Sequence, residues 1–204
     1  MMSKTRIEAF SDGVIAIIIT IMVLELHIPE LKEPFTRADV WNALLSLVPK
    51  LLSYLLSFVV VGILWINHHH LFDKIPHATS KLVWYNALLL FVMSLIPLPT
   101  AFLAEHPGLS EAVMFYGLVM FLNALAFLIL RHYVEVQAKL IAYNPKVHWS
   151  NWISTALYLF SIPMALVSVY LSFVIFVAIP LWYFLPDKLH GKVGDERHEI
   201  EKDL

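Results

Sequence analysis

An arginine, a serine and an aspartate stand at the start of the first apolar segment of the chain. Arg6, Ser11 and Asp12 lie within about two helical turns of one another, and the run from Val14 to Leu24 is apolar except for Thr20. Ionisable side chains at membrane depth are rare, and they usually face protein or a water-filled path rather than lipid. The segment therefore predicts a helix that lines a path for a cation.

The composition is that of an integral membrane protein. Of the 204 residues, 59% are hydrophobic and 15% are charged, whereas soluble domains have roughly 45–50% apolar and about 25% charged residues. The mean hydropathy is +0.73. The absence of cysteine excludes disulfides and thiolate metal sites, and no basic patch suggests a nucleic-acid partner.

Apolar segments predict an all-α, polytopic membrane domain that occupies residues 1–204. A hydrocarbon core of about 30 Å requires about 20 helical residues. The six expected transmembrane helices are at about 7–28, 49–69, 81–103, 111–130, 149–164 and 171–185, followed by a tail at 186–204. Residues 38–47 are either a short interfacial helix or an early start of the second span.

The last two spans follow from an uncharged stretch of unusual length. Residues 149–185 contain no charge, and one straight helix of that length would extend about 55 Å at 1.5 Å per residue. Because a bilayer is much thinner, we expect the chain to fold back between Pro163 and Ser172.

Lysine and arginine residues predict the orientation, since cytoplasmic loops carry an excess of them. With six spans, eleven fall on one side: Lys4, Arg6, Lys74, Lys81, Arg131, Lys139, Lys146, Lys188, Lys192, Arg197 and Lys202. Three fall on the other: Lys32, Arg37 and Lys50. Both termini, including the tail, are therefore expected to be cytoplasmic.

This orientation brings polar residues from three helices to one depth. The second helix runs inward and ends near Trp65 and His69, while the third starts again from the cytoplasm and carries Asn86. In hydrocarbon each polar group needs a partner, and indole, imidazole and amide donors satisfy a carboxylate. We expect a cluster of Ser11, Asp12, Trp65, His68, His69 and Asn86.

The helical wheel separates two faces of the first helix. At about 100° per residue, Ile17, Ile21 and Leu24 form one stripe with Thr20 at its edge. Asp12 points about 140° away from Ile17 by the same spacing. Asp12 is therefore predicted to be a structural clamp aimed at the supporting helices rather than an ion ligand, which leaves the stripe to face something else.

The run His68-His69-His70 leaves three interpretations open. Buried hydrogen bonding is favoured; a pH sensor is possible because histidine titrates near neutrality. A metal site is disfavoured, because ligands on one helix face need i, i+4 spacing.

Other function classes compete with a channel. A proton-coupled secondary transporter would use Asp12 and the histidines, but no paired inverted-repeat pattern is present. A membrane hydrolase or metal-dependent oxidase is least favoured, since no nucleophile–base pair or phosphate loop stands out. We therefore expect no enzymatic activity.

The motif Arg6-x-x-x-Phe10-Ser11-Asp12 matches the RxxxFSD signature, and the chain resembles the lysosomal potassium-channel family and its prokaryotic homologues. Trp65, His68, His69 and Asn86 agree with it, and the similarity extends over all six spans. A single six-helix unit resembles the prokaryotic form, whereas animal members resemble two fused units.

The resemblance implies a potassium-permeable channel in a prokaryotic cell membrane. It implies a homotetramer whose first helices line a fourfold pore, surrounded by lipid, without cofactor, fixed metal or small-molecule substrate. It places the constriction at Ile17 and Leu24, a hydroxyl ring at Thr20 and a further layer at Ile21. No TVGYG filter is present. The implied brace consists of Arg6, Phe10, Ser11, Asp12, Trp65, His68, His69 and Asn86.

Overall fold

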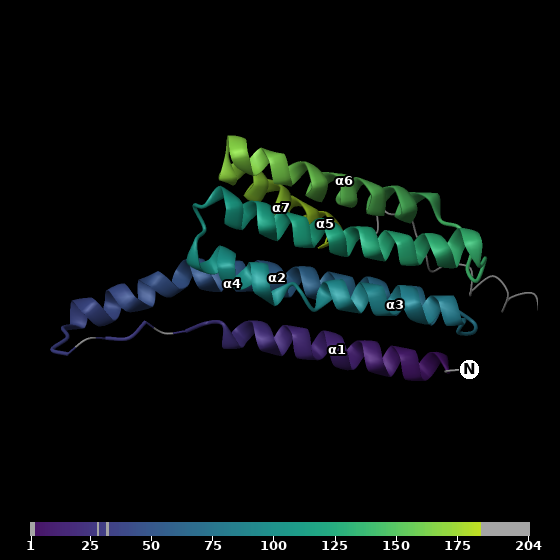
Figure 1. Cartoon of the computed structure of the whole chain (residues 1–204), viewed down its shortest axis with the longest axis horizontal. Coiled ribbons are helices and arrows are strands. Elements are labelled where there is room, and N and C mark those ends of the chain that lie inside the picture. The colour runs from purple at the N-terminus through teal and green to yellow at the C-terminus, as the bar shows by residue number, and fades with distance from the viewer. Residues whose placement is uncertain (1–2, 28, 32, 185–204) are drawn as a thin grey trace, which may run out of the picture.

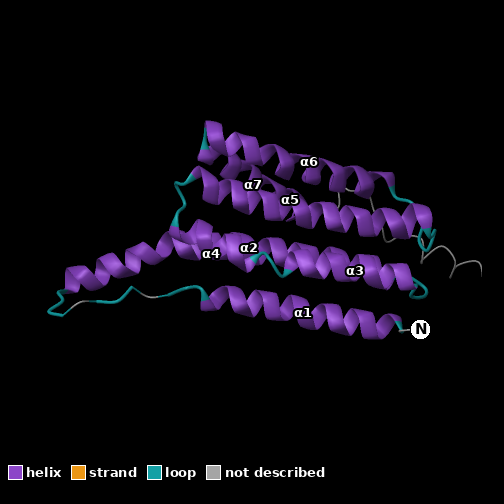
Figure 2. Cartoon of the chain, viewed as in Figure 1, coloured by secondary structure: helices purple, strands orange, loops and turns teal. Residues whose placement is uncertain are grey.

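The part of the chain that the structure describes is helical, without a strand (Figure 2). The structure is a computed structural model that describes residues 3–27, 29–31 and 33–184. Its elements are α1 (Lys4–Leu24), α2 (Arg37–Asp73), α3 (Ser80–Met93), α4 (Pro97–Glu105), α5 (Ser110–His132), the π-helical turn η1 (Tyr133–Gln137), α6 (Pro145–Val167) and α7 (Val169–Phe184).

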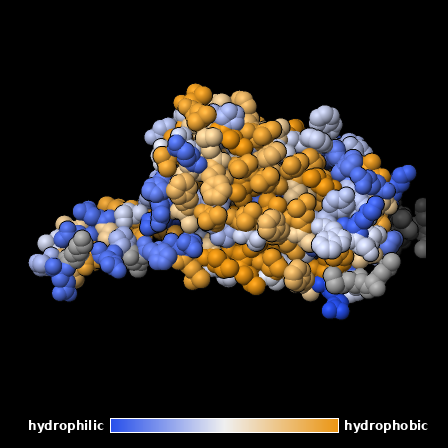
Figure 3. Space-filling model, in the orientation of Figure 1, coloured by the Kyte–Doolittle hydropathy of each residue, from blue (hydrophilic) through white to orange (hydrophobic). Residues whose placement is uncertain are grey.

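Among the described residues, five helical segments are long and apolar enough to cross a membrane: Lys4–Leu24, Arg37–Asp73, Ser80–Glu105, Ser110–Gln137 and Pro145–Val167. The sixth apolar helix, α7, is shorter, with 16 residues. On the face seen in Figure 3, hydrophobic side chains cover the middle of the molecule and hydrophilic ones gather at its two ends. This distribution suits a bundle that crosses a bilayer.

The helices run back and forth along one direction, with α1 on one side of the bundle, α2, α3 and α4 in the middle, and α5, α6 and α7 on the other side (Figure 1). α1 packs against α2, α3 and α4, while α5 packs against α6, α7 and α3. The start of α1 and the end of α2 lie at the same end of the bundle, because Lys4 Nζ donates to the Asp73 carbonyl at 3.0 Å.

The first helix ends earlier than expected. α1 stops at Leu24 with Glu25 as its C-cap, whereas the expected span continued beyond Leu24. Residue 28 itself, residue 185 and the predicted tail at 186–204 lie outside the described residues.

The second helix begins well before the expected residue 49. Thr36 and Asp39 form a capping box, in which Thr36 N donates to Asp39 Oδ2 at 2.7 Å and Asp39 N donates to Thr36 Oγ1 at 3.3 Å. This pair satisfies free backbone donors and fixes the helix start. Pro49 stays inside the helix, where it removes one backbone hydrogen bond. Residues 38–47 are therefore an early start of the second helix.

The third span is broken rather than continuous. α3 ends at Met93 and α4 begins at Pro97, with a turn at residues 94–96. Pro97 occupies the first turn of α4, where its missing N–H costs no helical bond. The break therefore follows from the proline that the sequence places inside the expected span 81–103.

The remaining helices are longer than their predicted spans. α5 continues past residue 130 into η1. α6 begins before residue 149 because Asn144 caps it, accepting from Lys146 N at 3.1 Å and Val147 N at 3.4 Å. The turn expected between Pro163 and Ser172 falls at Ser168, between α6 and α7.

Close packing at Gly117 gives a test of how α5, α6 and α7 fit together. A Cβ atom on Gly117 would lie 2.8 Å from Ser161 Oγ and 3.4 Å from the Phe176 ring, and Ser161 Oγ already donates to the Tyr158 carbonyl at 2.7 Å. Gly117→Ala should therefore destabilise the fold by about 1–3 kcal/mol, the usual cost of overpacking. Thermal unfolding of the purified protein in detergent would show a lower midpoint.

Gly62→Ala is the matched control, because no atom lies within 4 Å of its added Cβ. Alanine is favoured over glycine in a helix by about 0.8–1 kcal/mol, so this variant should be neutral or more stable. Equal midpoints for the two variants would contradict the packing at Gly117.

Candidate functional site

One face of α1 is buried against the rest of the chain. Its buried residues recur at helical spacing: Ile7, Ser11, Ile15, Ile18 and Met22. Four of the five are apolar, and Ser11 is the polar exception. This face fixes how α1 is rotated about its axis.

The opposite face of α1 is exposed in the single chain. Ile17 is 57% exposed and Leu24 is 69% exposed, and Thr20 and Ile21 are exposed beside them. Thr20 Oγ1 donates its proton to the Ile17 carbonyl at 2.9 Å. The hydroxyl oxygen therefore keeps its lone pairs as acceptors on this face.

A buried hydrogen-bond chain links α1, α2 and α3. His68 Nε2 and Asn86 Oδ1 are 2.8 Å apart, and Asn86 Nδ2 donates to Ser11 Oγ at 2.8 Å. Ser11 Oγ donates onward to the Ile7 carbonyl at 2.8 Å. Because the Asn86 oxygen only accepts, His68 Nε2 carries the proton. All three side chains are buried, so these hydrogen bonds join three helices in an environment of low dielectric constant.

A second polar contact joins α1 to α2. Trp65 Nε1 donates to Asp12 Oδ1 at 2.9 Å, and both residues are exposed in the single chain. The exposed His69 ring lies beside Trp65, with ring centroids 6.4 Å apart. The six residues expected to form one cluster thus divide into a buried chain and an exposed pair with His69 next to it.

The other two signature residues belong to neither group. Arg6 and Phe10 are exposed, and neither side chain makes a hydrogen bond or ion pair with another described residue. The three consecutive histidines also diverge, since His68 is buried while His69 and His70 are exposed. Over residues 3–27, 29–31 and 33–184, no group of three or more acidic or histidine side chains is arranged to hold a metal ion.

Sequence reasoning missed a second buried chain on the far side of α2. Thr100 Oγ1 donates to the Ile96 carbonyl at 2.7 Å, so Ser57, 2.7 Å from Thr100, donates to it. The Tyr116 hydroxyl lies 3.1 Å from Ser57 Oγ and donates in turn. The only signal in the sequence is a hydroxyl-bearing residue in each of three apolar segments.

A buried carboxylate in η1 was also missed. The Glu135 side chain is fully buried, 2.7 Å from Arg131 Nη2 and 3.7 Å from His148 Nδ1. Trp152 Nε1 donates to His148 Nε2 at 3.0 Å, so the proton of the neutral imidazole is on Nδ1, toward Glu135. An acidic residue four positions after an arginine was the available signal.

The buried chain predicts that Asn86 is needed for stability. Asn86→Leu leaves His68 and Ser11 without their partner, and each unpaired buried group costs about 1–3 kcal/mol. The unfolding midpoint of the purified protein should fall clearly. Asn42→Leu is the matched control because Asn42 is exposed, and it should change stability by less than about 0.5 kcal/mol. Equal unfolding midpoints for both variants would contradict this role of Asn86.

Comparisons with known proteins agree on one family. The sequence profile of the family described as "Endosomal/lysosomal potassium channel TMEM175" matches residues 6–97. A protein of Chryseobacterium named a potassium channel is 35% identical over 190 residues, which cover 92% of this chain and 95% of that protein. A zebrafish protein named endosomal/lysosomal proton channel TMEM175 is 35% identical over 134 residues, which cover 61% of this chain and 26% of that protein.

A solved structure gives the same result. The crystal structure of a TMEM175 homologue from Chamaesiphon minutus, described as a lysosomal potassium-selective channel homologue, superposes with a TM-score of 0.78 at 31% identity. The match covers 89% of this chain and 96% of that one. The chain therefore belongs to the TMEM175 family, a family of ion channels rather than enzymes.

Proposed function

We propose that the protein is a potassium channel that conducts passively through a pore lined by α1. The observation that carries this proposal is the exposed stripe of Ile17, Thr20, Ile21 and Leu24, which lies opposite the buried face of α1. The bacterial relative from Chryseobacterium, named a potassium channel, supports potassium as the permeant ion.

The pore requires more than one copy, and we propose a homotetramer embedded in lipid. α1 lies at one side of the bundle (Figure 1) and contacts only α2, α3 and α4 extensively. A groove of about 430 Å³ runs beside the stripe and is lined by Ile17 and Ile21 from α1 and by Pro97 and Leu98 from α4. Four copies of α1 around one axis would cover the stripe and enclose a path.

The constriction in this proposal is hydrophobic. Four Ile17 side chains form a ring that excludes water when narrow and so gates by dewetting. Potassium sheds its hydration water more easily than sodium, so a narrow ring penalises sodium more. The Thr20 oxygen, whose proton is held by the Ile17 carbonyl, replaces part of the lost shell. Selection of this kind needs no carbonyl filter of the TVGYG type.

The proposed orientation places both termini in the cytoplasm. Among the described residues, Lys4, Lys74, Lys81 and Arg131 lie at the ends of helices that meet where α1 begins (Figure 1). The positive-inside rule assigns this end to the cytoplasm. Glu25 then lies at the outer end of the stripe.

The alternative is a proton-coupled transporter that uses Asp12 and the histidines. The name of the zebrafish relative, a proton channel, favours some proton movement in the family. The buried chain, however, runs from His68 to the Ile7 carbonyl, while Asp12 pairs with Trp65. In liposomes, flux that only dissipates a potassium gradient supports the channel, and concentrative uptake of a coupled substrate supports the transporter.

Substitution of the proposed constriction tests the pore. Ile17→Asn makes the ring polar and should wet it, so the potassium leak should rise and selectivity over sodium should fall. Lowering the barrier by about 1.4 kcal/mol corresponds to a tenfold higher current, which single-channel recording of the purified protein in bilayers would resolve.

Val174→Asn on α7 is the matched control, because Val174 is 63% exposed but lies on another helix. Its conductance and selectivity should equal those of the native protein. Unchanged conductance in Ile17→Asn would show that Ile17 does not form the constriction.

Substitution of Asp12 tests the proposed structural brace of α1 separately from the pore. Asp12→Ala removes the acceptor of the Trp65 indole and should weaken assembly, with less tetramer in native mass spectrometry of the purified protein. Asp12→Asn keeps an acceptor oxygen and should assemble more fully. An alanine variant that assembles normally but has altered permeation would instead give Asp12 a direct role with the ion.

A further inference from the structure

A histidine at the start of α6 stands between two side chains that favour different protonation states of its ring. His148 Nε2 accepts from Trp152 Nε1 at 3.0 Å, while Nδ1 lies 3.7 Å from Glu135 Oε2 on η1. The first contact is a hydrogen bond within one helix, and the second is too long to be one. His148 is therefore bonded to its own helix and only adjacent to the carboxylate.

The carboxylate of Glu135 is buried and incompletely paired. Its side chain is 0% exposed, and Arg131 Nη2 lies 2.7 Å from Oε1 as an ion pair. Among the described residues, neither oxygen of Glu135 has a hydrogen-bond partner, and neither has His148 Nδ1. A buried carboxylate without hydrogen bonds is costly, so a cationic donor beside Oε2 would stabilise it.

A proton on His148 reverses the preference of its ring. Both nitrogens of an imidazolium carry a proton, so Nε2 can no longer accept from Trp152, and two N–H groups would face each other. The same proton places a positive charge beside Glu135, with which a charge-assisted hydrogen bond of about 2.7–2.9 Å can form. Trp152 is 50% exposed, so its freed indole has access to water. Both effects turn the ring from Trp152 toward Glu135.

We propose that His148 is a pH-dependent switch between α6 and η1. The neutral ring accepts from the Trp152 indole, and the protonated ring releases the indole and donates to Glu135. Histidine titrates near neutrality. A groove of about 580 Å³ is lined by both His148 and Glu135 together with exposed side chains such as Lys139 and Tyr143, so protons reach the switch from water.

Other charged and titratable groups surround His148. Among the described residues they are Arg131 and His132 on α5, Glu135 on η1, and Lys139 and Tyr143 in the connection to α6. Arg131 and Lys139 oppose a further positive charge, whereas Glu135 is the only acidic group of the set. An opposite charge within about 4–6 Å favours the charged form. Because Glu135 Oε2 has no hydrogen-bond partner, the protonated ring turns toward it.

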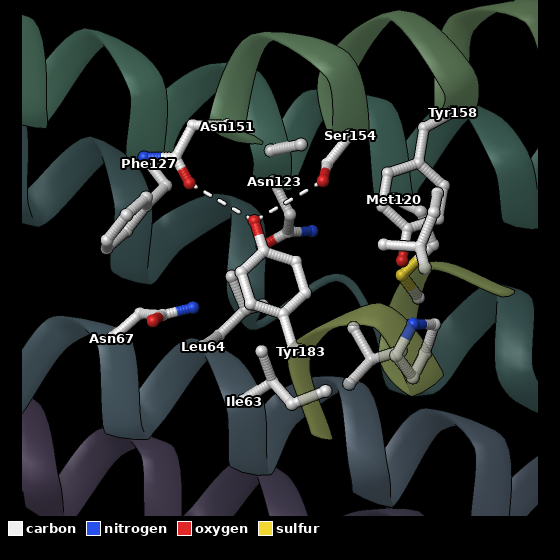
Figure 4. A pocket seen from close by; sticks show the side chains of 14 residues that line it. Ile63, Leu64, Asn67, Met120, Asn123, Phe127, Asn151, Ser154, Tyr158 and Tyr183 are labelled. Atoms are coloured by element: carbon white, nitrogen blue, oxygen red, sulfur yellow. Dashed lines mark hydrogen bonds between the residues drawn. The ribbon is translucent and has the colours of Figure 1, made fainter. Parts of the chain in front are cut away.

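The change is confined to the start of α6. One turn further on, Asn151 Oδ1 accepts from the Tyr183 hydroxyl of α7 at 3.1 Å, and Ser154 Oγ lies 3.3 Å from the same hydroxyl (Figure 4). None of these three groups titrates between pH 5 and 8. The proton therefore alters the contact between η1 and the first turn of α6 and leaves the contact between α6 and α7 in place.

The test is NMR of the full protein in lipid nanodiscs, with ¹⁵N in the tryptophan indoles and the Trp152 signal identified from its loss in Trp152→Phe. Between pH 8 and pH 5, the Trp152 indole signal should shift through one transition as its acceptor is lost. The Trp41 indole, near the other end of α2, should not shift and serves as the reference. A Trp152 signal that does not change over this range overturns the proposal.

Two histidine variants assign the transition. His148→Gln removes the ring and should abolish it. His132→Gln is the matched control, because His132 is exposed and its ring centroid lies 6.1 Å from that of His148; the transition should remain. A transition that persists in His148→Gln, or is lost in His132→Gln, contradicts the role of His148.

Glu135→Gln tests the second position of the ring. Without the negative charge the transition should move to lower pH by about one unit, and an unchanged midpoint would exclude the carboxylate. A structure of the native protein at pH 5 answers the same question even if this variant fails to fold. The His148 ring should then lie within hydrogen-bonding distance of Glu135, and a ring still bonded to Trp152 overturns the switch. Neither result depends on potassium conduction.

Discussion

The side chain of Asn86 holds three helices in one register. It donates to Ser11 on α1 and accepts from His68 on α2 while standing on α3, with both bonds at 2.8 Å. In the low dielectric of a membrane bundle these bonds have no competing water, so breaking either one leaves buried polar groups unpaired. The position and rotation of α1 depend on this contact.

The rotation of α1 about its own axis determines which residues lie on its exposed face. Adjacent residues differ by about 100° around a helix, so Ser11 faces the bundle while Asp12 reaches Trp65 at the edge. A turn of α1 that exposed Ser11 would break its bond to Asn86 and move Ile17 off the exposed face. Two polar neighbours with different partners therefore limit the rotation, which apolar packing alone would allow more freely.

The sequence predicted membrane depth better than side-chain pairing. Helical rise and chain direction place Ser11, His68 and Asn86 at one level, and the structure joins them. Helix ends were less predictable, because the capping box at Thr36 and the break before Pro97 depend on local bonds. The buried chain at Ser57 and the pair at Glu135 depend on the relative rotation of neighbouring helices, about which a nearly all-apolar helix carries little periodic signal.

The helices α1–α4 and the helices α5–α7 have different parts in the proposed channel. The residues of the proposed pore and brace lie on α1, α2 and α3, within the segment 6–97 that matches the family profile. In the proposed channel the dewetting ring would be sensitive to its radius, so the packing of α5 on α3 and of α7 on α2 would affect it. In the proposed channel, the polar contacts of Ser11 and Asp12 act together with the buried apolar face of α1 to fix the angle at which Ile17 would enter the pore.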